Sequence, residues 1–169
     1  LELNRIDDKA LAEAMKVPAL AHYKPWIDNL RMEKPYQLDD KLEELFLEKS
    51  QTSSSAFNRL FDETMAGLRF EVDGEVLTLE PTLNLMQSPD EAKRKAGSDA
   101  LARTFGENLK LFTLITNTLA KDKDISDRWR GFKDIADARH LSNRVEPEVV
   151  AALVEFVRRN YPQLSHRYY

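Results

Sequence analysis

The three histidines are the first residues to test for metal or acid–base chemistry, because the chain contains no cysteine. They are His22, His140 and His166. A zinc hydrolase typically places two histidines on one helix face with a glutamate beside them; the histidines hold Zn²⁺ and the glutamate takes a proton from the bound water. No second histidine or carboxylate follows any of the three at the required spacing. The sequence therefore predicts no metal site and no bound cofactor in this chain.

Nucleophilic and phosphate-binding motifs are not found either. The cluster Ser53–Ser55 lacks the G-x-S-x-G elbow and a positioned base, so a role at a helix start is favoured. The glycines are isolated, which rules out a P-loop or a dinucleotide fingerprint. Paired carboxylates, as in Asp39-Asp40, fall on polar helix faces, where the helix dipole favours them near the first turn. The sequence predicts no catalytic residue and leaves substrate-binding residues unidentified.

Composition narrows the class of protein. The chain has 169 residues, 42% of them hydrophobic and 32% charged, and a net charge of −4. These values are ordinary for one globular domain, and no concentrated basic stripe predicts nucleic-acid binding. No apolar run is long enough for a membrane span, and the absence of cysteine fits a reducing compartment, so we expect a cytoplasmic location. The chain starts without Met and ends in mid-pattern at Leu164, Tyr168 and Tyr169, which suggests a piece of a longer chain.

The elements that would position any site are mostly helices. Residues 38–79 predict two amphipathic helices separated by the polar run Gln51–Ser55, whose hydroxyls would cap the second helix. A β-hairpin from about Arg69 to Leu79 follows, because Asp73-Gly74 suits a type I′ turn. The expected fold class is mainly α, an irregular multi-helix bundle with this one hairpin.

The helices outside that stretch are predicted from caps and spacing. Ser88, Pro89 and Glu91 predict a capping box that opens a helix of some 30 residues, ended by the polar run Lys121–Asp124. Asp7 is expected to cap the first helix, and Pro147 to start an amphipathic helix through Val157. Tyr23 and Trp26 are expected to be core anchors. Gly97 and Gly106 are expected at close helix contacts or at a bend.

These segments resemble a known family. The runs EELFLEKSQTSSSAFNRLFDE and LRFEVDGEVLTL resemble the N-terminal half of the oligoendopeptidase F family, among the thimet-oligopeptidase-like zinc metallopeptidases. HYKPWIDNLRMEKPYQLDDKLEEL, RWRGFKDIADARHLSNRVEPEVVAALV and YPQLSHRYY continue the likeness over nearly the whole chain. The family's HExxH zinc motif is not in this sequence.

The resemblance implies a parent zinc metalloendopeptidase that hydrolyses short peptides. Residues 1–169 would form one helical N-terminal lobe, with a subdivision at the hairpin into 1–68 and 80–169 as an alternative. This lobe would form a wall or lid of the substrate channel, with a C-terminal catalytic lobe of the same chain as its partner. Zinc would belong to the parent, and the fragment alone is expected to be inactive. In such peptidases a Tyr and a His outside the zinc motif assist catalysis, but Arg139, His140, Arg167, Tyr168 and Tyr169 match no such motif.

A second reading is kept open. The chain could be a non-enzymatic helical protein-interaction or dimerisation module, in which the apolar helix faces dock a partner. In either case we expect an exposed apolar patch to include Leu164, Tyr168 or the face of the Val149–Val157 helix.

Overall fold

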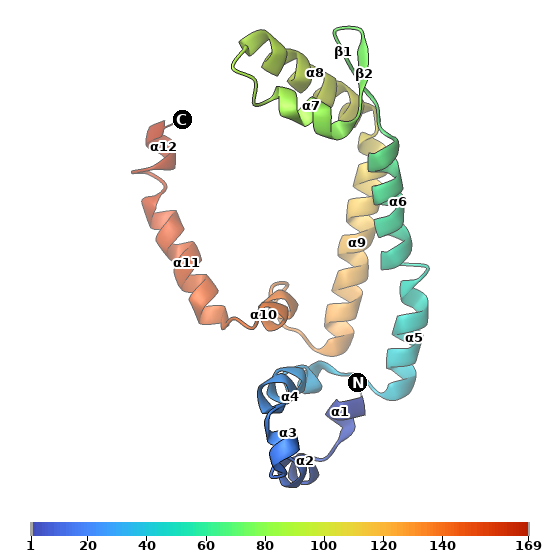
Figure 1. Cartoon of the computed structure of the whole chain (residues 1–169), viewed down its shortest axis with the longest axis vertical. Helices are drawn as coiled ribbons and strands as arrows, with labels where there is room; N and C mark the ends of the chain where they lie inside the picture. Colours follow the sequence, from blue (N-terminus) through green and yellow to red (C-terminus); the bar gives the residue numbers. More distant parts are fainter. Residues whose placement is uncertain (1, 169) are drawn as a thin grey trace. The chain divides into compact units, whose positions relative to one another are not determined.

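The computed structural model describes residues 2–168. In that part of the chain helices predominate, and the strands form a single two-stranded antiparallel sheet (Figure 1). The predicted fold class is confirmed. The chain divides into two compact units: residues 41–124 form the second, and the described residues on either side of that segment, 2–40 and 125–168, form the first. The hairpin, where a subdivision was considered, lies inside the second unit.

The second unit is built almost entirely from consecutive elements. They are α5 (Asp40–Ser50), α6 (Ser54–Gly67), β1 (Phe70–Val72), β2 (Glu75–Leu77), α7 (Leu79–Leu85), α8 (Glu91–Glu107) and α9 (Leu109–Arg130), of which α9 runs on into the first unit. The predicted sequence of helix, polar break, helix and hairpin is confirmed.

The hairpin is closed by the predicted two-residue turn. Asp73 has φ 50° and Gly74 has φ 85°, so both central residues adopt the positive φ that this turn requires. Val72 pairs with Glu75, and Phe70 pairs with Leu77. The hairpin is shorter than predicted, because Leu79 already begins α7.

The hydroxyl cluster between α5 and α6 was assigned to the wrong helix end. Ser53 is the N-cap of α6, but its side chain makes no capping bond there. Instead its Oγ donates to the Lys49 carbonyl at 3.0 Å, and Thr52 Oγ1 donates to the same carbonyl at 3.2 Å. Both hydroxyls thus bond to the Lys49 carbonyl, one of the last carbonyls of α5, which lack partners within the helix.

The predicted long helix is two helices. α8 ends before Asn108, whose side chain donates to the Thr104 carbonyl at 2.9 Å while its backbone N–H donates to Phe105. This local bonding competes with the helical ladder and breaks it. The predicted capping box is also wrong, because the N-cap of α8 is Asp90, which accepts the N–H of Ala92.

The polar run Lys121–Asp124 does not end a helix. α9 continues through it to Arg130, and Lys121 donates to Asp124 at 2.7 Å. Opposite charges three residues apart lie on one side of a helix and support it.

The apolar core of the second unit lies where α6, β1, α7 and α8 meet. Phe70 is fully buried, and Leu68, Val72 and Ala100 join it. Phe105 packs edge-on against Phe70 at 5.6 Å and against Phe112 at 6.0 Å between ring centroids. Ile115, in α9, is also buried. All buried apolar residues of the described chain belong to this unit.

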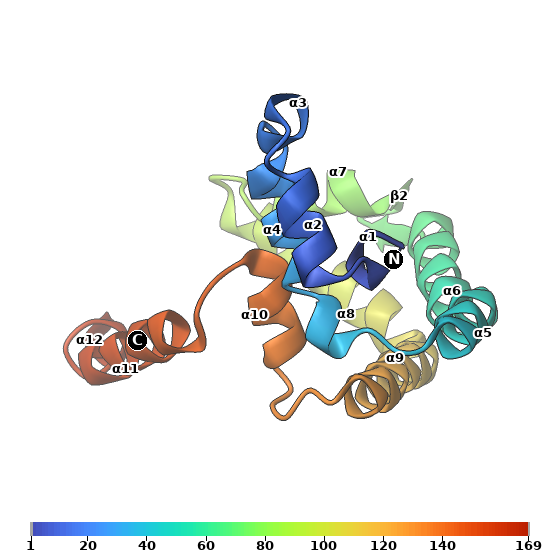
Figure 2. The ribbon, with the colours of Figure 1, turned by 90° about the horizontal axis from the view of Figure 1, so that it is seen from below.

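The first unit consists of short helices and one longer one. They are α1 (Glu2–Arg5), α2 (Asp8–Ala14), α3 (Pro18–Ala21), α4 (Lys24–Arg31), the 3₁₀ helix η1 (Lys34–Tyr36), α10 (Asp137–Asn143), α11 (Pro147–Asn160) and α12 (Ser165–Tyr168) (Figure 2). The predicted cap of α2 is confirmed, since Asp7 accepts from the N–H groups of Lys9 and Ala10. The predicted start of α11 at Pro147 is confirmed as well.

Polar contacts hold the first helices of this unit together. Arg31 donates to the carbonyls of Leu3 at 3.0 Å and Ile6 at 2.9 Å, and it also pairs with Asp8. The buried Asn4 donates to the Leu30 carbonyl at 3.1 Å. α1 is thereby fixed on α4.

The expectation that Tyr23 and Trp26 anchor a core is wrong. Tyr23 is 53% exposed and Trp26 is 55% exposed. The half-buried residues of α4 are Ile27, Leu30 and Arg31, so the two aromatic rings lie off the buried side of this short helix. In the described chain no helix is long and apolar enough to cross a bilayer.

Candidate functional site

The three histidines lie on separate elements of the first unit. His22 contacts Tyr23 edge-on, with ring centroids 5.4 Å apart, and His166 stacks on Tyr161 at 6.0 Å. His140 belongs to α10 and lines a hollow in the surface. Within residues 2–168, no group of three or more His, Asp or Glu side chains is placed to hold a metal ion.

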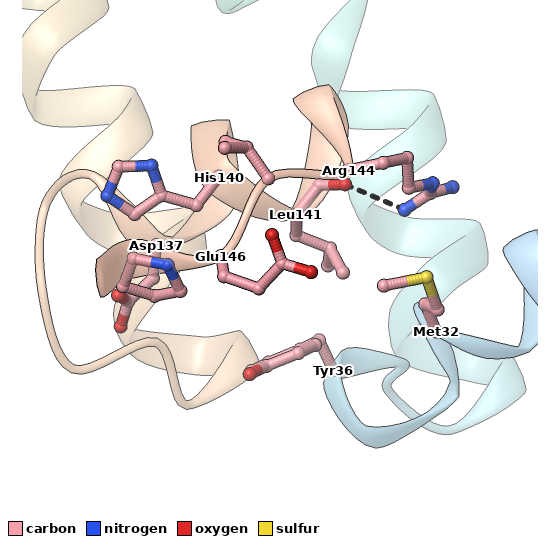
Figure 3. Close-up of a pocket in the computed structure, with 9 residues that line it drawn as sticks. Met32, Tyr36, Asp137, His140, Leu141, Arg144 and Glu146 are labelled. Atoms are coloured by element: carbon pink, nitrogen blue, oxygen red, sulfur yellow. Dashed lines mark hydrogen bonds between the residues drawn. The ribbon is translucent and has the colours of Figure 1, made fainter. Parts of the chain in front are cut away.

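The hollow beside α10 is the candidate site. Its volume is about 290 Å³, and all its lining residues belong to the first unit (Figure 3). The lining consists of Met32, Tyr36, Asp137, His140, Leu141, Arg144, Val145, Glu146 and Pro147. The hollow therefore lies between two groups of elements: the end of α4 with η1, and α10 with the start of α11.

The start of α10 is fixed by carboxylates. Asp137 accepts hydrogen bonds from the backbone N–H groups of Asp134 at 2.8 Å and Lys133 at 3.0 Å. These two bonds, with smaller contributions from the nearby His140 and Lys133 charges, hold the pKa of the Asp137 carboxyl below its usual value. Asp134 in turn accepts from the Ala136 N–H. Asp137 is thus committed to shaping the loop before α10.

The end of α10 forms a Schellman turn with an unusual residue. Arg144 has φ 53° and ψ 44°, the left-handed conformation that glycine usually supplies. The Val145 N–H reaches the His140 carbonyl, and the Arg144 N–H reaches that of Leu141. The guanidinium donates to the Leu141 carbonyl at 2.8 Å and to Glu33 at 2.9 Å, which joins α10 to the turn after α4.

The floor of the hollow is aromatic. Tyr36 stacks on Phe132 with centroids 4.1 Å apart and planes 14° from parallel, and the Tyr36 carbonyl accepts from Arg130. In Figure 3 the Glu146 carboxylate lies in the middle of the lining, with Tyr36 below it and Met32 to one side. Asp137 and Arg144 are already engaged in structural bonds, so the geometry suits binding more than bond breaking.

A second hollow, of about 350 Å³, lies between the hairpin and α8 in the second unit. Three of its charged side chains are engaged: Lys95 binds Asp99 at 2.5 Å, and Arg103 donates to the Glu71 carbonyl at 2.7 Å. Arg103 thereby satisfies the outward carbonyl of β1 and fixes the hairpin on α8.

Of the residues considered for chemistry from the sequence, the structure places only His140 in the hollow beside α10. Arg139 is exposed on the same helix, Tyr168 is 84% exposed in α12, and Tyr169 lies outside the described residues. The sequence reasoning did not identify Met32, Tyr36, Arg144 or Glu146. Glu33 and Arg144 are 111 positions apart, and no short-range pattern signals such a pairing.

The chain matches one family model and two individual proteins described here. Residues 2–70 match the family model for the N-terminal region of M3 peptidases, described as oligopeptidase F. Oligopeptidase PepF of Bacillus subtilis is 28% identical, over 96% of this chain and 25% of its own length. The chain is similar to the N-terminal part of oligopeptidase F. The resemblance predicted from the sequence is thereby confirmed, and the chain spans about a quarter of the length of that relative.

The match to the family model includes α1 to α6 and the first residue of β1, hence Met32 and Tyr36 of the hollow but not α10. Chaperone protein ClpB 1 of Nostoc is 31% identical, over 60% of this chain and 12% of its own length. No solved structure matches the chain significantly.

Proposed function

We propose that this chain is the N-terminal part of a longer zinc metalloendopeptidase that hydrolyses short peptides in the cytoplasm. The observation that carries the proposal is the similarity to oligopeptidase PepF, which extends over 96% of the chain and so includes both units. The predominantly helical fold agrees with the expectation from the family resemblance.

In the proposed enzyme this part has a shaping role. Its units would form a wall or lid of the substrate channel, which limits substrates by size and excludes water when closed. The hollow beside α10 agrees with this role, because Asp137 and Arg144 are held in structural contacts and its walls include Met32, Leu141 and Val145.

The described residues of this chain do not fit a zinc site. In the part that the structure describes, His22, His140 and His166 lie on different elements, and no cluster of His, Asp and Glu side chains is arranged as a ligand set. We therefore derive no catalytic step through zinc from these residues. In the proposal the metal and the catalytic base belong to the remaining length of the enzyme.

The test compares the longer protein with the 169-residue chain. Both are purified, their zinc content is measured, and cleavage of a short fluorogenic peptide is followed with and without a chelator. We expect stoichiometric zinc and chelator-sensitive cleavage in the longer protein, and neither in the 169-residue chain. Lack of peptide cleavage by the zinc-loaded longer protein would refute the proposal, as would chelator-sensitive cleavage by the short chain.

The non-enzymatic interaction module remains the second candidate, because one observation favours it. α11 exposes Val149, Leu153 and Phe156, each more than half accessible. Such a face is typical of a helix that docks a partner. A longer protein that binds no zinc and cleaves no peptide, yet forms a stable complex through α11, would support this reading instead.

A further inference from the structure

α11 carries an apolar face that is open in this structure. Val149 is 56% exposed, Leu153 is 61% exposed and Phe156 is 66% exposed. The spacing i, i+4, i+7 places these three side chains on one side of the helix. Beyond the helix end, Leu164 is 67% exposed as well.

The opposite side of α11 is charged. Glu148, Glu155 and Arg159 lie opposite the centre of the whole apolar face, which also includes Val150, Val154 and Val157, when the helix is drawn at about 100° per residue. Glu155 and Arg159 form an ion pair of 2.8 Å, one turn apart. Apolar and charged residues are therefore separated on the two sides, as in a helix that buries one face and leaves the other in water.

Helices of this length derive most of their stability from packing of the apolar face. In the described part of the first unit, α1 and α4 pack against each other. α11 has no comparably packed neighbour there. The apolar face of α11 therefore requires a partner beyond the residues that surround it here.

We infer that this face is the docking surface for the remaining part of the same longer polypeptide. The inference rests on the proposed function and names the partner of this part of the enzyme. The similarity to oligopeptidase PepF covers 96% of this chain, so the aligned region includes residues of α11. The other 75% of that relative's length lies outside the match. A tethered partner also acts at high effective concentration, which favours it over a second copy at ordinary protein concentrations.

Thiol labelling of the longer protein tests the inference. Single cysteines are introduced by Val149→Cys and Leu153→Cys on the apolar face, and by Glu155→Cys on the charged face as the matched control. The control is well matched, because the Glu155 side chain is 55% exposed in this structure, close to Val149. This chain has no cysteine of its own, and labelling is followed by mass spectrometry of the peptide that carries the new thiol.

In the native longer protein we expect the thiols at 149 and 153 to react at least tenfold more slowly than the thiol at 155. In the isolated 169-residue chain, and after denaturation of the longer protein, the three rates should agree within a factor of about three. Equal rates at all three positions in the native longer protein would refute the inference. Protection in the short chain that rises with its concentration would assign the face to a second copy and likewise refute it.

Peptide cleavage by the same longer proteins separates this inference from the proposed function. An active, zinc-loaded enzyme in which positions 149 and 153 label freely would refute the docking surface alone. An inactive protein in which both positions are protected would refute the peptidase proposal, while the docking of α11 on its own longer chain would stand.

Discussion

Gly97 is the residue at which a single missing side chain decides helix packing. A Cβ at this position of α8 would lie 2.9 Å from the Leu85 Cβ and 3.3 Å from the Thr82 carbonyl oxygen. Both atoms are fixed by the backbone of α7, which cannot yield as a side-chain tip can. Of the two meanings considered for Gly97 from the sequence, a close helix contact is the one that the structure shows.

We therefore predict that Gly97→Ala lowers the free energy of unfolding by about 1–2 kcal/mol, because overpacking outweighs the gain in helix propensity. Chemical denaturation monitored by circular dichroism measures the change. Gly106→Ala is the matched control, since it lies in the same helix with nothing within 4 Å of its new Cβ. It should be neutral or stabilising by up to about 1 kcal/mol, and an equal loss in both variants would contradict the packing argument.

Asp137 contributes to the stability of the folded chain, and the lowered pKa of its carboxyl gives the direction in which this contribution changes with pH. Its pKa is lowered in the folded chain chiefly by the N–H groups of Asp134 and Lys133. A lowered folded-state pKa means that the unfolded chain binds the proton more readily. The stabilisation is therefore complete above about pH 4, the ordinary range of an aspartate, and is lost as the pH falls through the folded pKa.

We predict that the stability difference between the unmodified chain and Asp137→Asn is constant near neutral pH and shrinks below about pH 4. The asparagine keeps an acceptor for both N–H groups but does not titrate. Denaturation at several pH values measures the difference, and a carboxyl ¹³C titration gives the pKa directly. A carboxyl that titrates at or above the ordinary value would contradict the assigned cause.

The cap of α8 shows what a sequence motif determines and what it leaves open. Ser88 and Glu91 have the spacing of a capping box, yet the helix begins two residues later, with Asp90 as N-cap. Ser88 accepts the N–H of Asp90 at 3.2 Å, so its hydroxyl closes the turn that precedes the helix. Both residues stabilise the start of α8, but only one caps it.

Asp90→Ala should cost about 1 kcal/mol of unfolding free energy, the usual value for a lost N-cap, and Ser88→Ala should cost less. Thermal denaturation of the two variants in parallel measures the difference. A larger loss in Ser88→Ala would restore the capping box and contradict the assignment of Asp90.

Local patterns predicted the elements well where one residue type has one effect. Asp73-Gly74 determines the turn, and Pro147 starts α11. They failed where a side chain can act in either direction along the backbone: Ser53 bonds back to α5, and Asn108 interrupts the ladder after Thr104.

The candidate site could not be predicted because it depends on distant pairs. Met32 and Tyr36 meet α10 only after folding, and the contact is fixed by Glu33 and Arg144. Arg144 also occupies a left-handed position for which the sequence pattern would favour glycine or asparagine. His140 was noticed as a residue type, but nothing near it in sequence indicated a hollow.

The two units of the whole molecule are stabilised in different ways. The second unit has an apolar core around Phe70 and consists of one continuous segment, Lys41–Asp124. The first unit is made from two stretches that are distant in the sequence, and polar contacts such as those of Arg31 hold it together. Among its described residues, the buried one is the polar Asn4. The apolar face of its helix α11 is open. This difference indicates that the first unit depends on further packing and that the second does not.

We therefore predict that residues 41–124, expressed alone, fold cooperatively, with a sigmoidal thermal transition and dispersed amide resonances. The aromatic contacts from Phe61 through Phe112 to Phe105 and Phe70 all lie within this segment, so excision removes no core residue. Phe70→Ala should abolish the transition, because truncation of a fully buried phenylalanine costs about 3–5 kcal/mol, much of the stability of a small domain. Val76→Ala, in the same hairpin but 67% exposed, is the matched control and should leave the transition nearly unchanged. A segment that unfolds gradually without either substitution would show that its core also requires the flanking helices.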